Sequence, residues 1–462
     1  MIDEKVINEF SQIVGARGLL NENLDLFTYS YDASFLPLLP AAKPDLVLKP
    51  QSTQEVAAIM KLAHKYRIPV VARGLGTGRT GGSVPAEGGL VLCLDEMNQI
   101  LELDDQNLML TVEPGVKTQD IYQFCAERGL FYPPDPSSLK QSTIGGNIAE
   151  NAGGPRAVKY GVTGDYVMGL EVVLADGSVL QTGGKMIKNV TGYDLTRLFV
   201  GSEGTLGIIT RAILRLIPMP KIRRTAQALF DSLDGACAAV SRSIKSGAIP
   251  AAAELMDQIS IEAVAKFRNI ELDPRVKAGV IFEFDGDSEA GLDAQIGEAE
   301  RLCAECGSVQ FRIAKTKEEE DELWSLRRGM SSAIAALAAN RIAEDISVPR
   351  AALPEIVKRL REIAARYGLQ LAVFGHAGDG NLHPSLLADL NAPGEKEKVE
   401  QAVGEIFQAA LAVGGTLSGE HGIGLTKKDY LADALGETGM AAIRSIKKAL
   451  DPAGILNPGK IF

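Results

Sequence analysis

The sequence has no long apolar run, no cluster of basic residues and few cysteines, and each absence excludes a class of protein. The amino terminus, MIDEKVINEF, is acidic and lacks the apolar segment of a signal peptide, and the alanine-rich stretch 331–343 is interrupted by Asn340 and Arg341. Lysine and arginine are scattered through a chain of net charge −11, so nucleic acid and anionic membranes are not expected partners. We therefore expect a cytoplasmic protein without a transmembrane segment.

The five cysteines, an odd number, do not form a disulfide framework. Only Cys303 and Cys306 lie close together, and two thiols at this spacing would suit half of a zinc or iron–sulfur site. Because there is no second cysteine pair and no histidine nearby, we favour two small side chains on one helix face. An iron–sulfur cluster in this chain is then not expected.

The chain of 462 residues, 46% of them apolar, is long enough for two or three domains. Ser52 and Glu55 have the spacing of a capping box before an expected helix at 53–66. Glycine-rich, strand-forming sequence follows from 68 to 218, with a hairpin turn at Asp176-Gly177.

The pattern changes after residue 218, where longer helical segments alternate with a few strands, and we expect a domain boundary there. Pro354 and Gly368 bracket one of these helices. The last twelve residues, DPAGILNPGKIF, are turn-rich but carry apolar side chains, so we expect this tail to dock back onto the body.

Residues 70–85, VVARGLGTGRTGGSVP, match the glycine pattern of dinucleotide-binding folds. In a Rossmann domain a helix follows these glycines, but Gly82 and Pro85 prevent one here, so we reject a nicotinamide-dependent dehydrogenase. The loop still exposes backbone N–H groups able to wrap a diphosphate. Two further segments, 133–161 and 201–210, combine glycine with asparagine and hydroxyl side chains and also suit close approach to a ligand.

These three segments, in this order, together with the carboxyl-terminal NPGK, resemble the FAD-linked oxidase family, whose flavin domain is of the vanillyl-alcohol-oxidase type. Within the family the chain resembles the hydroxy-acid branch, which contains the catalytic subunit of glycolate oxidase and D-lactate dehydrogenases. The resemblance implies an α+β protein. The protein that the resemblance implies would consist of a two-subdomain FAD-binding domain at 1–219, an α/β cap domain for the substrate at 220–425, and a segment at 426–462 that returns to the flavin domain.

The resemblance also implies a set of FAD-binding residues. The loop that holds the diphosphate consists of Arg73, Gly74, Gly76, Thr77, Gly78, Gly81 and Gly82. The rest of the site is formed by Pro134, Asp135, Thr143, Gly146, Asn147, Asn151, Gly153, Glu203, Gly207 and Ile209, with Asn457 near the isoalloxazine ring. Some relatives attach FAD covalently through a histidine of this loop, but residues 70–90 contain none. We therefore predict noncovalent FAD.

Three of the four histidines fall in two short glycine-rich segments, FGHAGDGNLHP at 374–384 and SGEHGIG at 418–424. A two-residue turn centred on Asp379-Gly380 would pair His376 directly with His383 on neighbouring strands. Their Cβ atoms would then be roughly 5 Å apart on one face, which suits shared coordination of a metal.

Glu420 offers a third, carboxylate ligand, and His421 would remain for proton transfer. The resemblance implies the same roles for the matching histidines and glutamate of the hydroxy-acid branch. Such a mixed set accepts zinc, manganese or ferrous iron.

Arg327, in LWSLRRG, matches the element of the family that binds the substrate carboxylate, and a solvated arginine on a helix face is the alternative. Relatives that take dicarboxylates carry an extra lysine where this chain has Ala343 or Glu344, which argues for a monocarboxylate. We expect the hydroxy acid to chelate the metal, His421 to remove the hydroxyl proton, and a hydride to pass to flavin N5.

The expected external acceptor is an electron-transfer flavoprotein, an iron–sulfur subunit, or a quinone reached through peripheral membrane association. Two alternatives remain at this stage. One is a flavin oxidase or reductase of the same fold acting on a non-acid substrate, which would need no metal. The other is a non-catalytic flavin subunit of an electron-transfer complex.

Overall fold

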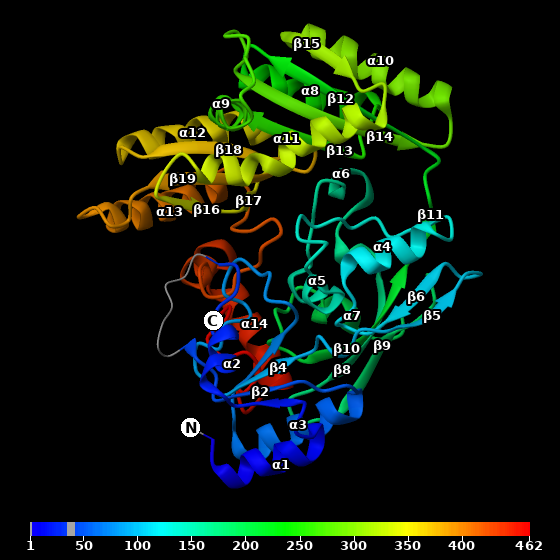
Figure 1. The fold of residues 1–462 in the computed structure, drawn as a ribbon, viewed down its shortest axis with the longest axis vertical. Coiled ribbons are helices and arrows are strands. Elements are labelled where there is room, and N and C mark those ends of the chain that lie inside the picture. The colour runs from blue at the N-terminus through cyan, green and yellow to red at the C-terminus, as the bar shows by residue number, and fades with distance from the viewer. Residues whose placement is uncertain (1, 35–41) are drawn as a thin grey trace. The chain divides into compact units, whose positions relative to one another are not determined.

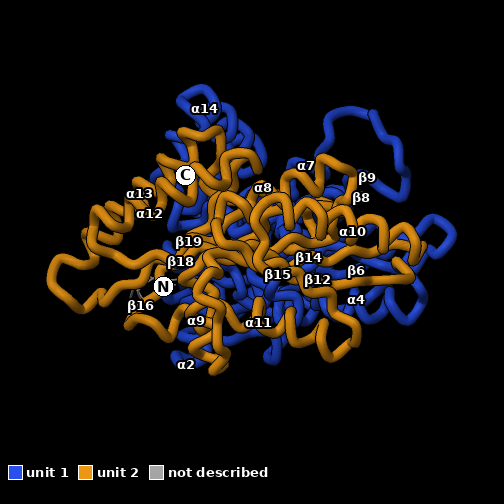
Figure 2. The backbone as a smooth tube through the Cα atoms, turned by 90° about the horizontal axis from the view of Figure 1, so that it is seen from above, with its two compact units in different colours: residues 1–153, 162–219, 420–462 blue, residues 154–161, 220–419 orange. Residues whose placement is uncertain are grey.

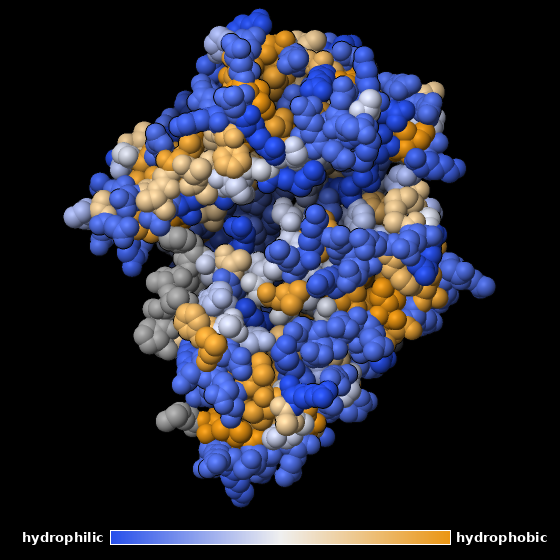
Figure 3. Space-filling view, in the orientation of Figure 1, coloured by the Kyte–Doolittle hydropathy of each residue, from blue (hydrophilic) through white to orange (hydrophobic). Residues whose placement is uncertain are grey.

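The computed structural model describes residues 2–34 and 42–462, which form two compact units (Figure 2). Unit 1 contains residues 1–153, 162–219 and 420–462. Unit 2 contains residues 154–161 and 220–419. The mixture of helices and sheets confirms the expected α+β class. Hydrophilic side chains dominate the face shown in Figure 3, with separate apolar patches between them.

The first sheet of unit 1 has the strand order β1-β2-β4-β3. Strands β2, β4 and β3 run parallel, and β1 is antiparallel to β2. The strands are β1 (Leu19–Leu20), β2 (Leu46–Leu48), β3 (Val70–Arg73) and β4 (Leu90–Cys93). Two amphipathic helices, α1 (Glu4–Val14) and α3 (Thr53–Tyr66), share one buried core with this sheet, and α2 (Asn23–Thr28) follows β1.

The second sheet of unit 1 is antiparallel, in the order β5-β6-β10-β8-β9. Its strands are β5 (Ile100–Asp104), β6 (Met109–Val112), β8 (Val167–Val173), β9 (Val179–Gly183) and β10 (Ile208–Arg215). The remaining elements of the unit are α4 (Thr118–Ala126), β7 (Leu130–Phe131), α5 (Ile144–Glu150), η2 (Thr163–Asp165), α7 (Leu195–Phe199), β11 (Ile217–Pro218), η4 (Lys428–Tyr430) and α14 (Leu431–Leu450) (Figure 1).

Unit 2 is built on an eight-stranded sheet in the order β15-β12-β14-β13-β18-β19-β16, with β17 also pairing with β19. The strands are β12 (Ile222–Phe230), β13 (Ala252–Asp257), β14 (Ala278–Gly286), β15 (Ser308–Ile313), β16 (Asn340–Ala343), β17 (Ile346–Ser347), β18 (Gln370–His376) and β19 (Asn381–Ala388). The helices are α8 (Leu233–Ser246), α9 (Gln258–Arg268), α10 (Glu289–Glu305), α11 (Lys317–Ala335), η3 (Arg350–Ala352), α12 (Leu353–Arg366) and α13 (Glu395–Ala412).

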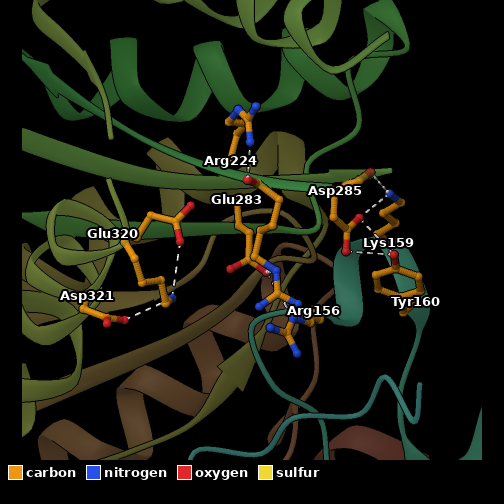
Figure 4. A network of polar contacts seen from close by, with 10 residues as sticks. Arg156, Lys159, Tyr160, Arg224, Glu283, Asp285, Glu320 and Asp321 are labelled. Atoms are coloured by element: carbon orange, nitrogen blue, oxygen red, sulfur yellow. Dashed lines mark hydrogen bonds and ion pairs between the residues drawn. The ribbon is translucent and has the colours of Figure 1, made fainter. Parts of the chain in front are cut away.

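The short helix α6 (Ala157–Tyr160) belongs to unit 2 although it lies between two segments of unit 1 in the sequence. It is held by buried charges on β14 (Figure 4). Arg156 contacts Glu283 at 3.2 Å, and Asp285 accepts hydrogen bonds from Lys159 at 2.5 Å and from Tyr160 at 2.9 Å. Because both carboxylates are buried, these contacts fix the segment firmly on the sheet.

Several local predictions are confirmed. Helix α3 begins after Ser52, whose hydroxyl accepts a hydrogen bond from the Glu55 amide at 3.2 Å, although the Glu55 carboxylate returns to the Gln51 amide and not to Ser52. The β8–β9 hairpin turns at Asp176-Gly177, with Gly177 at φ +81°.

The carboxyl-terminal tail docks as expected, since Ile455 and Leu456 are buried in the core of unit 1 and Leu456 pairs with Val70. Cys303 is buried in the last turn of α10, and Cys306 is the residue that caps the end of this helix.

Candidate functional site

A cavity in unit 1 is lined by all three glycine-rich segments singled out in the sequence. The first contributes the end of β3 and the start of the loop after it, the second contributes α5, and the third contributes the turn before β10. Its walls contain six of the predicted FAD-binding residues, namely Arg73, Gly74, Thr143, Gly146, Gly207 and Ile209, and also Ala72, Leu94, Pro114, Gly145, Ala149, Ser202 and Gly204.

The glycine loop after β3 contains no helix: residues 74–89, all of them described, form turns and irregular backbone. This confirms the exclusion of a Rossmann domain. Gly76 and Gly81 have φ values of +69° and +80°, which favour glycine. The guanidinium of Arg73 is buried beneath the loop and donates to the Tyr31 carbonyl at 2.8 Å and to the Ser83 hydroxyl at 3.3 Å, so it supports the loop from inside.

Helix α5 presents its amino-terminal end to the cavity. Thr143 caps it by accepting a hydrogen bond from the Gly146 amide at 3.4 Å. The side chain of Asn147 donates to Thr118 at 2.6 Å, and Asn151, in the left-handed region, accepts from the Gly164 amide at 2.8 Å. Asn147 is therefore bonded to a side chain of α4, and Asn151 to the backbone of η2. Of the other predicted residues, Pro134 is buried and Asp135 is half-buried, in the segment after β7.

Glu203 and Asn457 form a link that the sequence did not reveal. The two carboxylate oxygens of Glu203 accept hydrogen bonds from the Ile423 and Gly424 amides, each at 2.7 Å. The Asn457 side chain donates to the Gly82 carbonyl at 2.9 Å and to the Glu203 carbonyl at 2.6 Å. These contacts tie the carboxyl-terminal tail and the segment after His421 to the glycine loop.

The two histidines of unit 2 lie on one face of the sheet, but in a register different from the predicted one. His376 is opposite Asn381, and His383 is opposite Phe374, so the two are diagonal neighbours. The prediction of a two-residue turn at Asp379-Gly380 was therefore wrong. Residues 377–380 form a four-residue loop in which only Gly380 has positive φ, at +88°. The shift is two residues, which keeps both rings on the same face, with centroids 5.4 Å apart.

Glu254, on β13, joins His376 to Arg327. Its carboxylate contacts His376 Nδ1 at 2.5 Å and accepts a hydrogen bond from Arg327 Nε at 2.6 Å. Burial would raise the pKa of this carboxyl group, but the charges of His376 and Arg327 hold it below its ordinary value. A fully buried glutamate in the apolar strand AAELMD is the signal that could have identified this residue from the sequence.

Arg327 also packs over the ring of Phe374, with its guanidinium carbon 4.8 Å from the centroid. Nε of Arg327 donates to Glu254, and the two terminal nitrogens are the donors of the guanidinium that suit a carboxylate ligand. Arg341 approaches the same ring at 5.6 Å and donates to Ser385 at 3.0 Å. The alternative of a solvated Arg327 is not supported, since its side chain is only 11% exposed.

Glu420 and His421 begin the last segment of unit 1. Within that unit, Glu420 packs against Gly153, and His421 Nε2 lies 3.9 Å from the Glu420 carboxylate. Thr80 donates to the His421 carbonyl at 3.1 Å. The preceding residues belong to unit 2, where Asp345 accepts hydrogen bonds from Ser418 at 2.5 Å and from the Gly419 amide at 3.0 Å.

Two family models match the chain, and both are consistent with FAD binding in this cavity and at the glycine loop. Residues 44–183 match the model of an FAD binding domain, and residues 219–461 match the C-terminal domain of FAD linked oxidases. The chain therefore belongs to the FAD-linked oxidase family and is an FAD-dependent flavoprotein.

Three curated relatives define the branch. The chain is 46% identical over its whole length to glycolate oxidase subunit GlcD of Bacillus subtilis (strain 168), covering 97% of that protein. It is 36% identical over 90% of its length to glycolate oxidase subunit GlcD of Escherichia coli (strain K12), covering 83% of that relative. It is 35% identical over its whole length to a D-lactate dehydrogenase of Anaerostipes hadrus, covering 98%. The chain is thus an oxidoreductase of the branch that contains these hydroxy-acid enzymes.

Solved structures support the fold. A p-cresol methylhydroxylase has a TM-score of 0.80 at 17% identity, and a 4-ethylphenol oxidase from Gulosibacter chungangensis has a TM-score of 0.80 at 22% identity. Each comparison covers 99% of this chain and 96% of the other. The vanillyl-alcohol-oxidase type of fold is therefore confirmed. Among the described residues, no helix is long and apolar enough to span a bilayer.

Proposed function

We propose that this protein oxidises a small D-2-hydroxy acid, such as D-lactate or glycolate, to the 2-oxo acid, and that the reaction needs a divalent metal. The relatives named as glycolate oxidase subunits and a D-lactate dehydrogenase support the substrate class. FAD bound in the cavity of unit 1 would accept the hydride at N5.

The observation that carries the proposal is the buried arrangement of His376, Glu254 and Arg327. A carboxylate that engages Nδ1 of a histidine fixes its tautomer and directs Nε2 toward a metal, as outer-sphere partners of metal ligands commonly do. One carboxylate oxygen of Glu254 therefore orients the proposed metal ligand His376, and the other orients Arg327, the proposed carboxylate-binding residue.

His376, His383 and Glu420 are the proposed ligands. The two histidines lie on the same face of the sheet. Glu420 directly follows Gly419, whose backbone amide donates a hydrogen bond to Asp345. Two histidines and a carboxylate suit zinc, manganese or ferrous iron and leave positions for substrate oxygens. A metal held there would make the hydroxyl group of the substrate more acidic.

Two residues of the chain have separate roles in binding the substrate and in removing its proton. Arg327 binds and orients the substrate carboxylate through its terminal nitrogens. His421 accepts the hydroxyl proton, and its backbone is fixed by Thr80 on one side and by the Glu203 contacts of the next residues on the other. Electrons leave to an external acceptor, for which an electron-transfer flavoprotein, an iron–sulfur subunit and a quinone are the candidates.

Replacing Glu254 with glutamine should lower metal affinity by roughly 10- to 100-fold, the usual effect of losing an outer-sphere partner of a metal ligand. FAD content should not change, because Glu254 lies in unit 2 and the FAD cavity in unit 1. Metal titration of the chelator-treated protein measures the effect, with the exposed Glu262→Gln on α9 as the control. Equal metal affinity in Glu254→Gln and wild type would show that Glu254 does not support the ligand.

Acid precipitation should release FAD into the supernatant, since the glycine loop lacks the histidine through which some relatives attach the cofactor. The absorbance of the supernatant at the visible flavin bands measures the released fraction. Flavin that remains in the pellet after washing would contradict noncovalent binding.

A further inference from the structure

We propose that Glu150 is a contact residue of the bound flavin and that its carboxyl group forms a hydrogen bond with the cofactor. The inference rests on the site of FAD in the cavity of unit 1 and adds a residue that none of the sequence motifs assigned. Glu150 is the last residue of α5, and Thr143, Gly146 and Ala149 of the same segment line the cavity.

The carboxyl group of Glu150 lies between the glycine loop and the segment after His421. A Cβ atom added at Gly82 would lie 2.9 Å from Glu150 Oε1. A Cβ atom added at Gly422 would overlap Glu150 Oε2. A side chain at either position would crowd this carboxyl group, and the φ of Gly422, +81°, also favours glycine there. The two segments that face the carboxyl group are those proposed to hold the diphosphate and the base.

Oε2 of Glu150 is buried and has no hydrogen-bond partner among the described residues, although the residue as a whole is half-buried. Buried polar atoms are nearly always hydrogen-bonded, so a group from outside the polypeptide is expected to complete this one. The ribityl hydroxyls and the ring carbonyls and nitrogens of a flavin supply such partners. A bound flavin would supply a hydrogen-bond partner for Oε2 of Glu150.

The surroundings of Glu150 favour the neutral form of its carboxyl group. Burial raises its pKa well above the ordinary value, the negative charges of Glu203 and Asp32 raise it further, and Lys427 opposes them. A neutral carboxylic acid is a hydrogen-bond donor and does not repel the anionic diphosphate of FAD. Glutamine has a similar shape and keeps an N–H donor, whereas leucine keeps the size without any polar atom.

The test compares wild type with Glu150→Leu and Glu150→Gln, and uses the exposed Glu127→Gln as a control. The measurements are the dissociation constant of FAD from the holoenzyme and the visible spectrum of bound flavin. Glu150→Leu should raise the Kd for FAD by roughly tenfold or more and shift the flavin bands, because a hydrogen bond to a buried group is lost. Glu150→Gln should stay within about threefold of wild type.

FAD affinity and a flavin spectrum unchanged in Glu150→Leu would overturn the inference. Unfolding temperatures of the FAD-bound and FAD-free forms guard against a purely structural effect. Equal losses in both forms, with unchanged FAD affinity, would also overturn it. If the wild-type protein bound no FAD, the proposed FAD site in unit 1 would itself be wrong. Failure of the FAD site can therefore be distinguished from failure of the Glu150 contact.

Discussion

Replacing His421 with alanine should leave FAD bound but slow its reduction by substrate by about 10²- to 10⁴-fold, the range typical of losing a general base. The expectation follows from the position of His421. Its side chain is 17% exposed, and its backbone is held against the glycine loop by Thr80, so the imidazole is presented from a fixed segment. Single-turnover mixing under anaerobic conditions, followed at the visible flavin band, measures this step without the acceptor.

The same substitution at His64 provides the matched control, because His64 lies on α3 within the helix that covers the first sheet of unit 1. The substrate should reduce the FAD bound to the His64→Ala variant at the wild-type rate. Unchanged bleaching in His421→Ala would remove His421 from the role of base, and loss of FAD from that variant would indicate a structural role instead.

Replacing His376 or His383 with alanine should abolish tight metal binding, with the metal content falling from about one ion per chain to near zero after dialysis. Each histidine would supply one of only three protein ligands, and the two rings lie in a T-shaped arrangement on one sheet surface, with centroids 5.4 Å apart. Elemental analysis of the purified variants measures this, and flavin reduction by hydroxy acids should be lost in parallel.

Two controls separate metal loss from unfolding. The FAD content of both variants should equal that of wild type, since the cavity lies in unit 1 and the histidines in unit 2. Replacing Asn391, an exposed residue after β19, with alanine should not change the metal content. Stoichiometric metal in both histidine variants would contradict the proposed ligand set.

Local sequence rules predicted much of the fold because the signals were short-range. The capping position at Ser52, the turn at Asp176-Gly177 and the brackets at Pro354 and Gly368 each depend on one or two neighbouring residues. The exclusion of a Rossmann domain also followed from local chemistry, since the glycines and Pro85 after the loop do not allow a helix.

The histidine hairpin shows where such rules stop. Asp-Gly favours a two-residue turn, but here long-range contacts set the register. The Asn381 side chain donates to Asp345 at 2.5 Å, which fixes the start of β19 against a distant segment. Gly380 is confined by the carbonyl of Val348, where any side chain would overlap. Neither contact has a signal in the residues of the hairpin itself.

The contacts of the buried carboxylates were missed for a related reason. Glu203 was predicted to bind FAD, but its partner Ile423 lies more than fifty residues away, as does His376, the partner of Glu254. Glu150 was not predicted, and the glycines beside its carboxyl group are also distant in the sequence. A charged residue in an apolar strand indicates a buried partner but not its identity. Tertiary structure was needed to show that Glu254 joins a proposed metal ligand to the proposed carboxylate-binding arginine.

The most direct test of the account is anaerobic mixing of the purified protein with D-lactate, L-lactate, glycolate and D-2-hydroxyglutarate, with and without prior treatment by a chelator. The account predicts rapid bleaching of the flavin by D-lactate or glycolate, its loss after chelation, and its recovery on adding back one divalent metal. Protein that holds both FAD and metal but is bleached by none of these hydroxy acids would contradict the account.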